Sequence, residues 1–250
     1  MAYKLQAGTY DFTDLIEEMP DFGHEWRIAE ETAPRRHGSI ITEDPVIDRR
    51  TITARGAYMA ATYALARAEM ATMAVALATQ PLTLTVDSDG RYITAYAASF
   101  RPEWIEGSAT TSFRFELEFK CSDPFFYASA ADSSSQVVTY SPTSWAVSNS
   151  GDVLVFPTIT ITADQGGAIS NFTLTNSTTG KSFTFSGTVS NTKSLVVNCA
   201  NGTVQNDGAD ARNGLSGTLF LWLPTGSNTL QLSGANATVT VAFRKRYYTP

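Results

Sequence analysis

The chain has 250 residues, of which 43% are hydrophobic and 17% are charged, and its formal net charge is −6. This length suits one large or two modest domains, and this composition is typical of a globular rather than a disordered protein. The charge is uneven, because residues 1–127 hold 12 Lys/Arg and 19 Asp/Glu whereas residues 128–250 hold 6 and 5. Neither half carries the basic patch expected of a nucleic-acid-binding protein.

The first half is predicted to combine strands with one long helix. An Ala-, Met- and Leu-rich run over residues 57–79 predicts a helix about 34 Å long that Pro81 ends. Arg67 and Glu69 lie near the middle of this run, so we expect no insertion into a membrane. The other expected elements are a strand at 51–55, a hairpin of strands 82–86 and 91–100 around a turn at 87–90, and a loop near 102–107.

Residues 113–127 combine a strict alternation with an aromatic end. The apolar set is Phe113, Phe115, Leu117 and Phe119, and the charged set between them is Arg114, Glu116, Glu118 and Lys120. This period of two predicts a strand with one buried and one charged face. Pro124 cannot donate to a sheet ladder, so pairing is expected to stop there, just before Phe125, Phe126 and Tyr127.

The second half has almost no helical signal. Short alternating runs cover residues 153–162, 172–175, 182–185, 194–199, 218–223, 229–232 and 237–246, with Gly, Asn and Asp turns between them. Many short strands at this spacing predict an antiparallel sandwich or jelly roll. Residues 128–135, rich in Ser and Ala, are predicted to be a linker or an early loop.

Residues suited to catalysis or metal binding are sparse. His24 and His37 are the only histidines, and both lie in the first half, so the second half cannot form a Ser-His-Asp or Cys-His arrangement by itself. No metal-binding or phosphate-binding motif appears, so we expect neither enzymatic activity nor a cofactor. Cys121 and Cys199 are interpreted as small buried hydrophobic residues, and whether they pair stays open.

Three sequence motifs resemble one known family. The stretch with Cys121, Asp123, Pro124, Phe125, Phe126 and Tyr127, just before the middle of the chain, resembles the distal tail proteins of long-tailed bacteriophages. The segment with Pro224, Gly226 and Asn228 resembles a Leu-Pro-x-Gly-x-Asn hairpin of that family, and residues 242–250 resemble its basic and aromatic last strand. Residues 36–38 and 47–52 lie where family members carry a glycine and a charged strand start, so the resemblance covers essentially the full chain.

The resemblance implies a mainly β protein with two domains. Residues 1–127 would form a tail-tube-like β-sandwich or split barrel of α+β character, which builds a ring. Residues 128–250 would form a galectin-like antiparallel β-sandwich whose final strand, 237–248, packs back near the junction. The Cys121–Tyr127 stretch would mark that junction.

The same resemblance implies a structural role in the virion. A homohexameric ring at the distal end of a non-contractile tail would join the tail tube to the baseplate hub, with side fibres or a receptor-binding protein as further partners. DNA would pass through its channel without specific binding, and the protein would be made in the host bacterial cytoplasm. The candidates for the lumen or the subunit interface are Arg49, Arg50, Arg114, Glu116, Glu118 and Lys120.

Two hypotheses from other classes stay open. A carbohydrate- or receptor-binding module of the tail tip would use an aromatic platform such as Trp145 or Trp222 in the second half. The histidine of the usual galectin sugar site is missing there. A hydrolase would need a catalytic constellation that the sequence does not supply.

Overall fold

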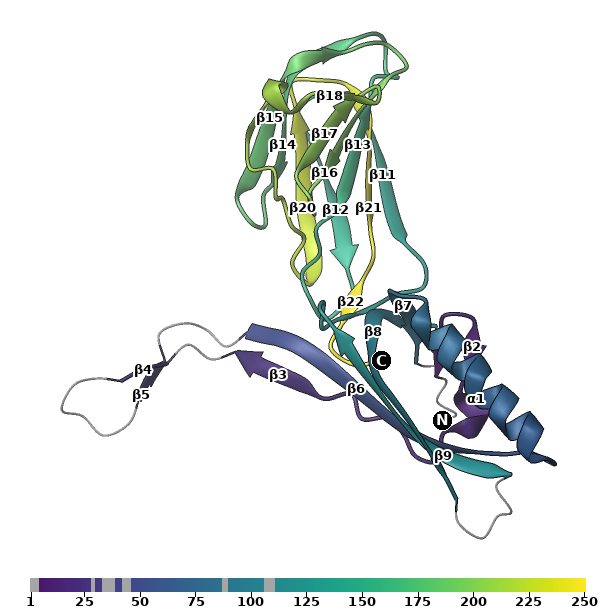
Figure 1. Cartoon of the computed structure of the whole chain (residues 1–250). Helices are drawn as coiled ribbons and strands as arrows, with labels where there is room; N and C mark the ends of the chain where they lie inside the picture. The colour runs from purple at the N-terminus through teal and green to yellow at the C-terminus, as the bar shows by residue number, and fades with distance from the viewer. Residues whose placement is uncertain (1–4, 28–29, 33–38, 42–45, 87–89, 106–110) are drawn as a thin grey trace. The chain divides into compact units, whose positions relative to one another are not determined.

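The computed structural model describes the chain except for residues 1–4, 28–29, 33–38, 42–45, 87–89 and 106–110. The described chain divides into two compact units, Met1–Tyr127 with Tyr248–Pro250, and Ala128–Tyr247. Both units are built from antiparallel sheets (Figure 1), which confirms the prediction of a mainly β protein. The last three residues return to the first unit, so the second unit ends earlier than the predicted domain 128–250.

One antiparallel sheet dominates the first unit, with the strand order β2-β1-β7-β8-β9-β6-β3. These strands are β1 (Gln6–Ala7), β2 (Tyr10–Asp11), β3 (His24–Arg27), β6 (Val46–Met59), β7 (Leu82–Thr85), β8 (Tyr92–Trp104) and β9 (Ser112–Cys121). β10 (Phe126–Tyr127) pairs with β8, β4 (Glu30–Thr32) pairs with β5 (Ser39–Ile41), and η1 (Thr13–Leu15) is a short 3-10 helix.

The predicted helix over 57–79 begins too early. The helix α1 is Tyr63–Ala78, and Thr62 caps it by accepting a hydrogen bond from the Leu65 amide. Residues 57–59 instead complete β6, which is much longer than the predicted strand 51–55. The cause is tertiary, because these residues continue a ladder with β9 that pairs Met59 with Ser112. Strand pairing therefore overrides the helix propensity of these residues.

The predicted hairpin of the first half is present, with differences at its ends. β7 pairs with the first part of β8, while the predicted turn at 87–90 lies largely outside the described residues. The expected loop near 102–107 is wrong at its start, because β8 runs through Pro102 to Trp104 alongside β9. β7 does not pair with this part of β8, and proline is tolerated at such a strand edge.

The alternation of β9 forms the core of the first unit as predicted. Phe113, Leu117 and Phe119 have no exposed surface, and Phe115 is 3% exposed. Gly56 lies opposite Phe115, and a Cβ atom there would come within 2.2 Å of the Leu15 carbonyl oxygen. Glycine is therefore required at this point of β6, since the preceding chain crosses it closely.

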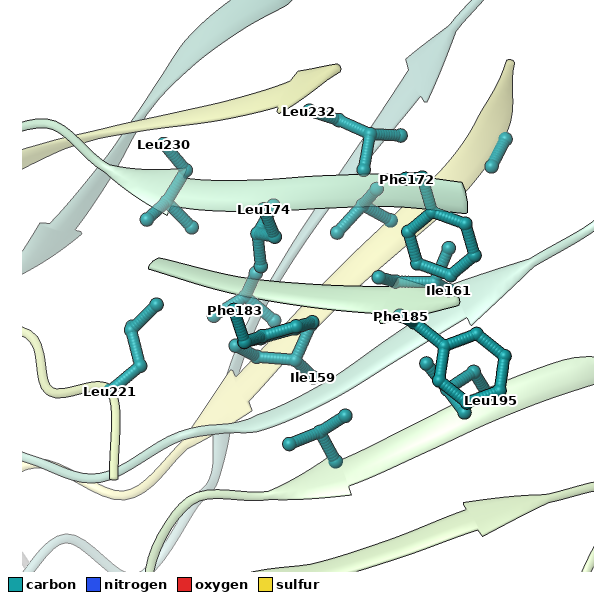
Figure 2. Close-up of a cluster of buried hydrophobic side chains, with 14 of the residues drawn as sticks. Ile159, Ile161, Phe172, Leu174, Phe183, Phe185, Leu195, Leu221, Leu230 and Leu232 are labelled. Carbon is teal, nitrogen blue, oxygen red and sulfur yellow. The ribbon is translucent and has the colours of Figure 1, made fainter. Parts of the chain in front are cut away.

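The second unit is a sandwich of two antiparallel sheets with the orders β11-β21-β13-β16-β17-β18 and β12-β20-β14-β15-β19. The first sheet comprises β11 (Asp132–Val138), β13 (Thr158–Thr162), β16 (Ser194–Asn198), β17 (Thr203–Asn206), β18 (Ala209–Asp210) and β21 (Ala237–Phe243). The second comprises β12 (Thr143–Asn149), β14 (Ile169–Asn176), β15 (Lys181–Val189), β19 (Leu215–Gly217) and β20 (Gly226–Ser233). Figure 2 shows aromatic and aliphatic side chains of both sheets packed together between them.

Several predictions for the second half need correction. The predicted linker 128–135 is wrong beyond its first residues, because β11 begins at Asp132 and pairs with β21. The predicted strand 218–223 is absent, and only Leu223 makes a bridge there, to Val155. The predicted strand 237–246 is interrupted into β21 and β22 (Arg246–Tyr247). Hydrophobic alternation does not identify strands that are polar and Ser-rich, and it wrongly predicts strands in loops that are apolar.

Candidate functional site

The charged face of β9 lies in the middle of a three-stranded patch with alternating charges. In the register, Arg114 stands opposite Glu103 of β8, and Glu116 stands between Arg101 of β8 and Arg55 of β6. Opposite charges that face each other across strands stabilise a sheet by about 0.2–1 kcal/mol per pair. The face of β6, β8 and β9 therefore carries charge without a strong excess of either sign.

The ion pairs on this face are weak and accessible. Arg55 Nε lies 3.4 Å from Glu116 Oε2, and their side chains are 65% and 40% exposed. Arg55 also lies 3.9 Å from Glu18 Oε1, and Lys120 Nζ lies 3.8 Å from Glu118 Oε1. Exposed pairs of this kind contribute about 0–1 kcal/mol and are screened by salt. Their charges consequently remain available to a partner.

A shallow hollow of about 430 Å³ opens on the same face. Its lining includes Glu17, Arg55, Arg101, Glu103 and Arg114. The lining mixes arginines with glutamates, so the hollow suits a polar protein surface with paired charges better than a uniformly charged polymer. Arg114, Glu116, Glu118 and Lys120 of the predicted set thus share one surface.

Arg50 does not belong to that surface, and its prediction as a lumen or interface residue is corrected. Its side chain is 2% exposed, whereas the neighbouring Arg49 is exposed. The guanidinium donates to the carbonyl oxygens of Phe22, Pro124 and Tyr248, each at 2.7 Å. Burial lowers the pKa of Arg50, and arginine nevertheless keeps its charge in proteins. Arg50 is therefore a buried structural cation.

The stretch from Cys121 to Tyr127 forms part of the first unit's fold. Asp123 accepts hydrogen bonds from the Phe125 amide, at 3.3 Å, and from the Tyr127 hydroxyl. The Phe126 ring is buried beside the Arg50 guanidinium, which lies 4.8 Å from the ring centroid. The aspartate thus closes a local turn. Of the three aromatic residues after it, Phe126 is buried in the core, whereas Phe125 and Tyr127 are half-buried at its edge.

The Tyr127 ring stacks on the ring of Tyr92 in β8, with the centroids 5.8 Å apart. Cys121 ends β9 opposite Arg50, and burial raises the pKa of the Cys121 thiol to about 12. Burial likewise raises the pKa of Cys199, in the second unit, to about 12. Both thiols are free and buried, so neither is a reactive nucleophile.

The segment with Pro224, Gly226 and Asn228 does not form the predicted tight hairpin. The residues before Pro224 pair with no part of β20, and β20 instead lies between β12 and β14. Asn228 is fully buried and donates to the carbonyl oxygens of Pro224, at 2.9 Å, and of Gly226, at 3.2 Å. These residues therefore hold a loop against the sandwich.

Aromatic side chains of the second unit have mixed exposure. Trp222 is half-buried, with Lys181 Nζ 5.6 Å from its ring centroid, and Phe156 and Phe220 are 39% and 49% exposed. Trp145 packs against the core, and its buried Nε1 atom has no hydrogen-bond partner in the described structure. Phe156 and Phe220 thus expose apolar surface, whereas the Trp222 ring has a charged lysine beside it.

Within the described residues, no group of His, Cys, Asp and Glu is arranged to hold a metal ion. The same residues contain no helix of sufficient length and hydrophobicity to cross a membrane.

Two features were missed in the sequence. The first is the role of Arg50, whose three carbonyl partners lie up to 198 positions away, so no local signal could reveal it. The second is the exposed face of α1, where Leu65 is 55% and Val75 is 71% exposed. The scarcity of charged residues in this helix, only Arg67 and Glu69, was a signal for that apolar surface.

Comparisons with known proteins agree with this architecture. A protein-family model, siphovirus-type tail component, C-terminal domain, matches residues 150–247. The crystal structure of SPP1 Dit (gp 19.1), described as a paradigm of the hub adsorption apparatus in Gram-positive infecting phages, matches with a TM-score of 0.78 and 17% identity. That match covers 98% of this chain and 99% of the SPP1 chain.

Chains in two baseplate structures also share the fold. The phage P2 baseplate in its activated conformation with Ca matches with a TM-score of 0.52 and 8% identity over 100% of both chains. The corresponding structure with Sr gives 0.50 and 10% over 99% of both. A search of curated proteins found no match. Residues 150–247 therefore match the model of the siphovirus-type tail component domain, and the whole chain has the fold of SPP1 Dit, as the sequence resemblance indicated.

Proposed function

We propose that this protein is a non-enzymatic structural component of the distal tail of a long-tailed phage, where it joins the tail tube to the baseplate hub. The observation that carries the proposal is the agreement of the SPP1 Dit fold over 98% of the chain with the tail-component family match in the second unit. The protein would reside in the virion after synthesis in the host cytoplasm. Fold alone does not specify function, so the surfaces must supply further support.

A closed homohexameric ring is the assembly that we propose. A ring uses head-to-tail contacts, so each subunit needs two different patches that complement each other. The exposed stripe of α1 is one candidate, because Ala64, Ala68, Ala71, Val75 and Ala78 are exposed and uncharged. Exposed apolar surface of this kind often marks a contact with another protein.

The charged face of β9 is the second candidate, either as part of the subunit interface or as part of the channel wall. Its arginines and glutamates face each other in pairs, and the unit as a whole is acidic. A channel wall without excess positive charge would let DNA pass, since bound phosphates are held mainly by Lys and Arg. The ring would therefore work through its shape, as a passage for DNA and a joint between tail tube and hub, and not through catalysis.

Light scattering of the full-length chain tests the role of α1. The variant Val75→Glu places a charge in the apolar stripe and should shift a hexamer toward monomers. The matched control is Val137→Glu, a 49% exposed residue of β11 in the second unit, which should leave the mass unchanged. Equal masses for wild type and Val75→Glu at hexamer size would rule out α1 as a subunit contact.

A receptor-binding role of the second unit is the alternative, favoured by the exposed Phe156 and Phe220 and the half-buried Trp222. Binding of the intact chain to host cell-wall glycans, lost in Trp222→Ala while the ring persists, would support it. Side fibres or a receptor-binding protein are the alternative ligands for the same unit, and they would compete with such glycans.

A further inference from the structure

A single buried guanidinium joins three distant segments of the first unit. Arg50 Nε donates to the Pro124 carbonyl, one terminal nitrogen donates to Phe22 and the other donates to Tyr248, all at 2.7 Å. Arg50 itself belongs to β6, so all three segments are held to this strand. Each nitrogen of the guanidinium group is thus engaged with a different stretch of backbone.

Two of the three segments lie where the chain leaves the first unit for the second and where it returns. Pro124 lies shortly before Tyr127, where the first unit ends, and Tyr248 is the residue at which the chain rejoins it. The third segment, at Phe22, belongs to the N-terminal stretch that runs along the edge of β6. The guanidinium therefore binds three segments at one point: the two that link the first unit to the second, and the N-terminal stretch.

The returning residues are held by further contacts within the first unit. Arg91 donates to the carbonyl oxygens of Thr249 and Pro250, at 3.2 and 3.0 Å. The ring of Phe125 meets the ring of Tyr248 edge-on, with centroids 5.6 Å apart. The final three residues are consequently a structural part of the first unit rather than a loose tail.

The chemistry of this contact makes its parts depend on one another. A buried cation is costly unless it is compensated, and here three carbonyl oxygens accept hydrogen bonds from it and the face of Phe126 lies against it. The planar fork of arginine can reach three carbonyls in different directions, whereas the ammonium group of lysine is a single point. If one carbonyl leaves, the charge becomes undersatisfied and the other contacts weaken.

We infer that Arg50 is a clamp that holds the N-terminal stretch and both connections of the second unit as one cooperative element. Opening of either connection would then loosen the other and the Phe22 stretch together. Arg50 would have this role whether or not the protein has the proposed function, because its three acceptors all belong to this chain.

Hydrogen exchange followed by mass spectrometry on the full-length chain tests the clamp. Deletion of residues 248–250 removes the Tyr248 acceptor of Arg50, the two Arg91 acceptors and the ring beside Phe125, and it leaves Arg50 in place. The Phe22 peptide therefore gives the decisive readout, because Phe22 contacts Arg50 and Phe126. We expect exchange in peptides covering Phe22 and residues 123–127 to rise by about tenfold or more, as expected for loss of a charge-assisted hydrogen bond. Peptides of β13 and β14 in the second unit should not change.

Variants at Arg50 and its neighbour complete the design. Arg50→Met should raise hydrogen exchange in all three segments. Arg50→Lys should give exchange rates between those of the wild type and Arg50→Met. Arg49→Met, at the exposed neighbour, is the matched control and should change none of them. The clamp would be refuted if the deletion raised exchange only at residues 245–247, or if it raised exchange uniformly over the first unit. If Arg50→Met does not fold, the deletion and Arg50→Lys still decide between these outcomes.

Discussion

The apolar face of β9 offers a quantitative test of how the first unit is built. Phe115 is 3% exposed, and its ring centroid lies 6.0 Å from that of Phe12, 6.2 Å from Phe100 and 6.3 Å from Phe113. The substitution Phe115→Ala removes the ring and leaves a cavity among side chains that cannot fully collapse. Such substitutions cost about 3–5 kcal/mol. For a unit of about 130 residues, this lowers the melting temperature by about 10–20 °C.

The assay must separate the two units, because a chain with two compact units need not unfold in one step. Urea denaturation followed by circular dichroism, combined with hydrogen exchange of β9, assigns each transition to its unit. Glu116→Ala is the control, since truncation of this half-exposed neighbour should cost at most about 1 kcal/mol. A loss below about 1 kcal/mol for Phe115→Ala would refute a buried Phe face.

The other predictions concern backbone contact, thiol chemistry and a buried amide. Gly56→Ala should destabilise the first unit, and Phe115→Ala should not rescue it, because the added Cβ still meets a backbone carbonyl; rescue in thermal unfolding would contradict this. Cys121 and Cys199 should resist Ellman's reagent at pH 8 until the chain is denatured, and rapid labelling of the native chain would show them accessible. Because folding raises both thiol pKa values from 9.0 to about 12, their contribution to stability should be complete below pH 9 and decline toward pH 12; stability that rises over this window would contradict the direction of the shift. Asn228→Ala should cost about 1–3 kcal/mol in the second unit, and an unchanged urea midpoint would mean that its two carbonyl contacts are dispensable.

Elements specified by local pattern were predicted well. The alternation of β9 identified its buried and charged faces, because a period of two determines which side chains share a face. The β7–β8 hairpin followed from two short strands close in sequence. The resemblance through the Cys121–Tyr127 stretch indicated the fold that the comparisons then supported.

Elements specified by distant contacts were not predictable. Residues 57–59 have helical composition but pair with β9, and the polar β11 resembles a linker until β21 completes its ladder. Arg50 resembled a surface residue in a charged run, yet its three acceptors come from the two ends and the middle of the chain. Burial of a charge depends on such long-range partners, which no local window contains.

Six copies of this chain would build the proposed ring that joins a tail tube to a baseplate. Negative-stain electron microscopy of the purified full-length protein tests it most directly. We expect single rings with six-fold symmetry and a central hole wide enough for duplex DNA. Particles that remain monomeric across micromolar concentrations, or that grow into long tubes, would contradict it.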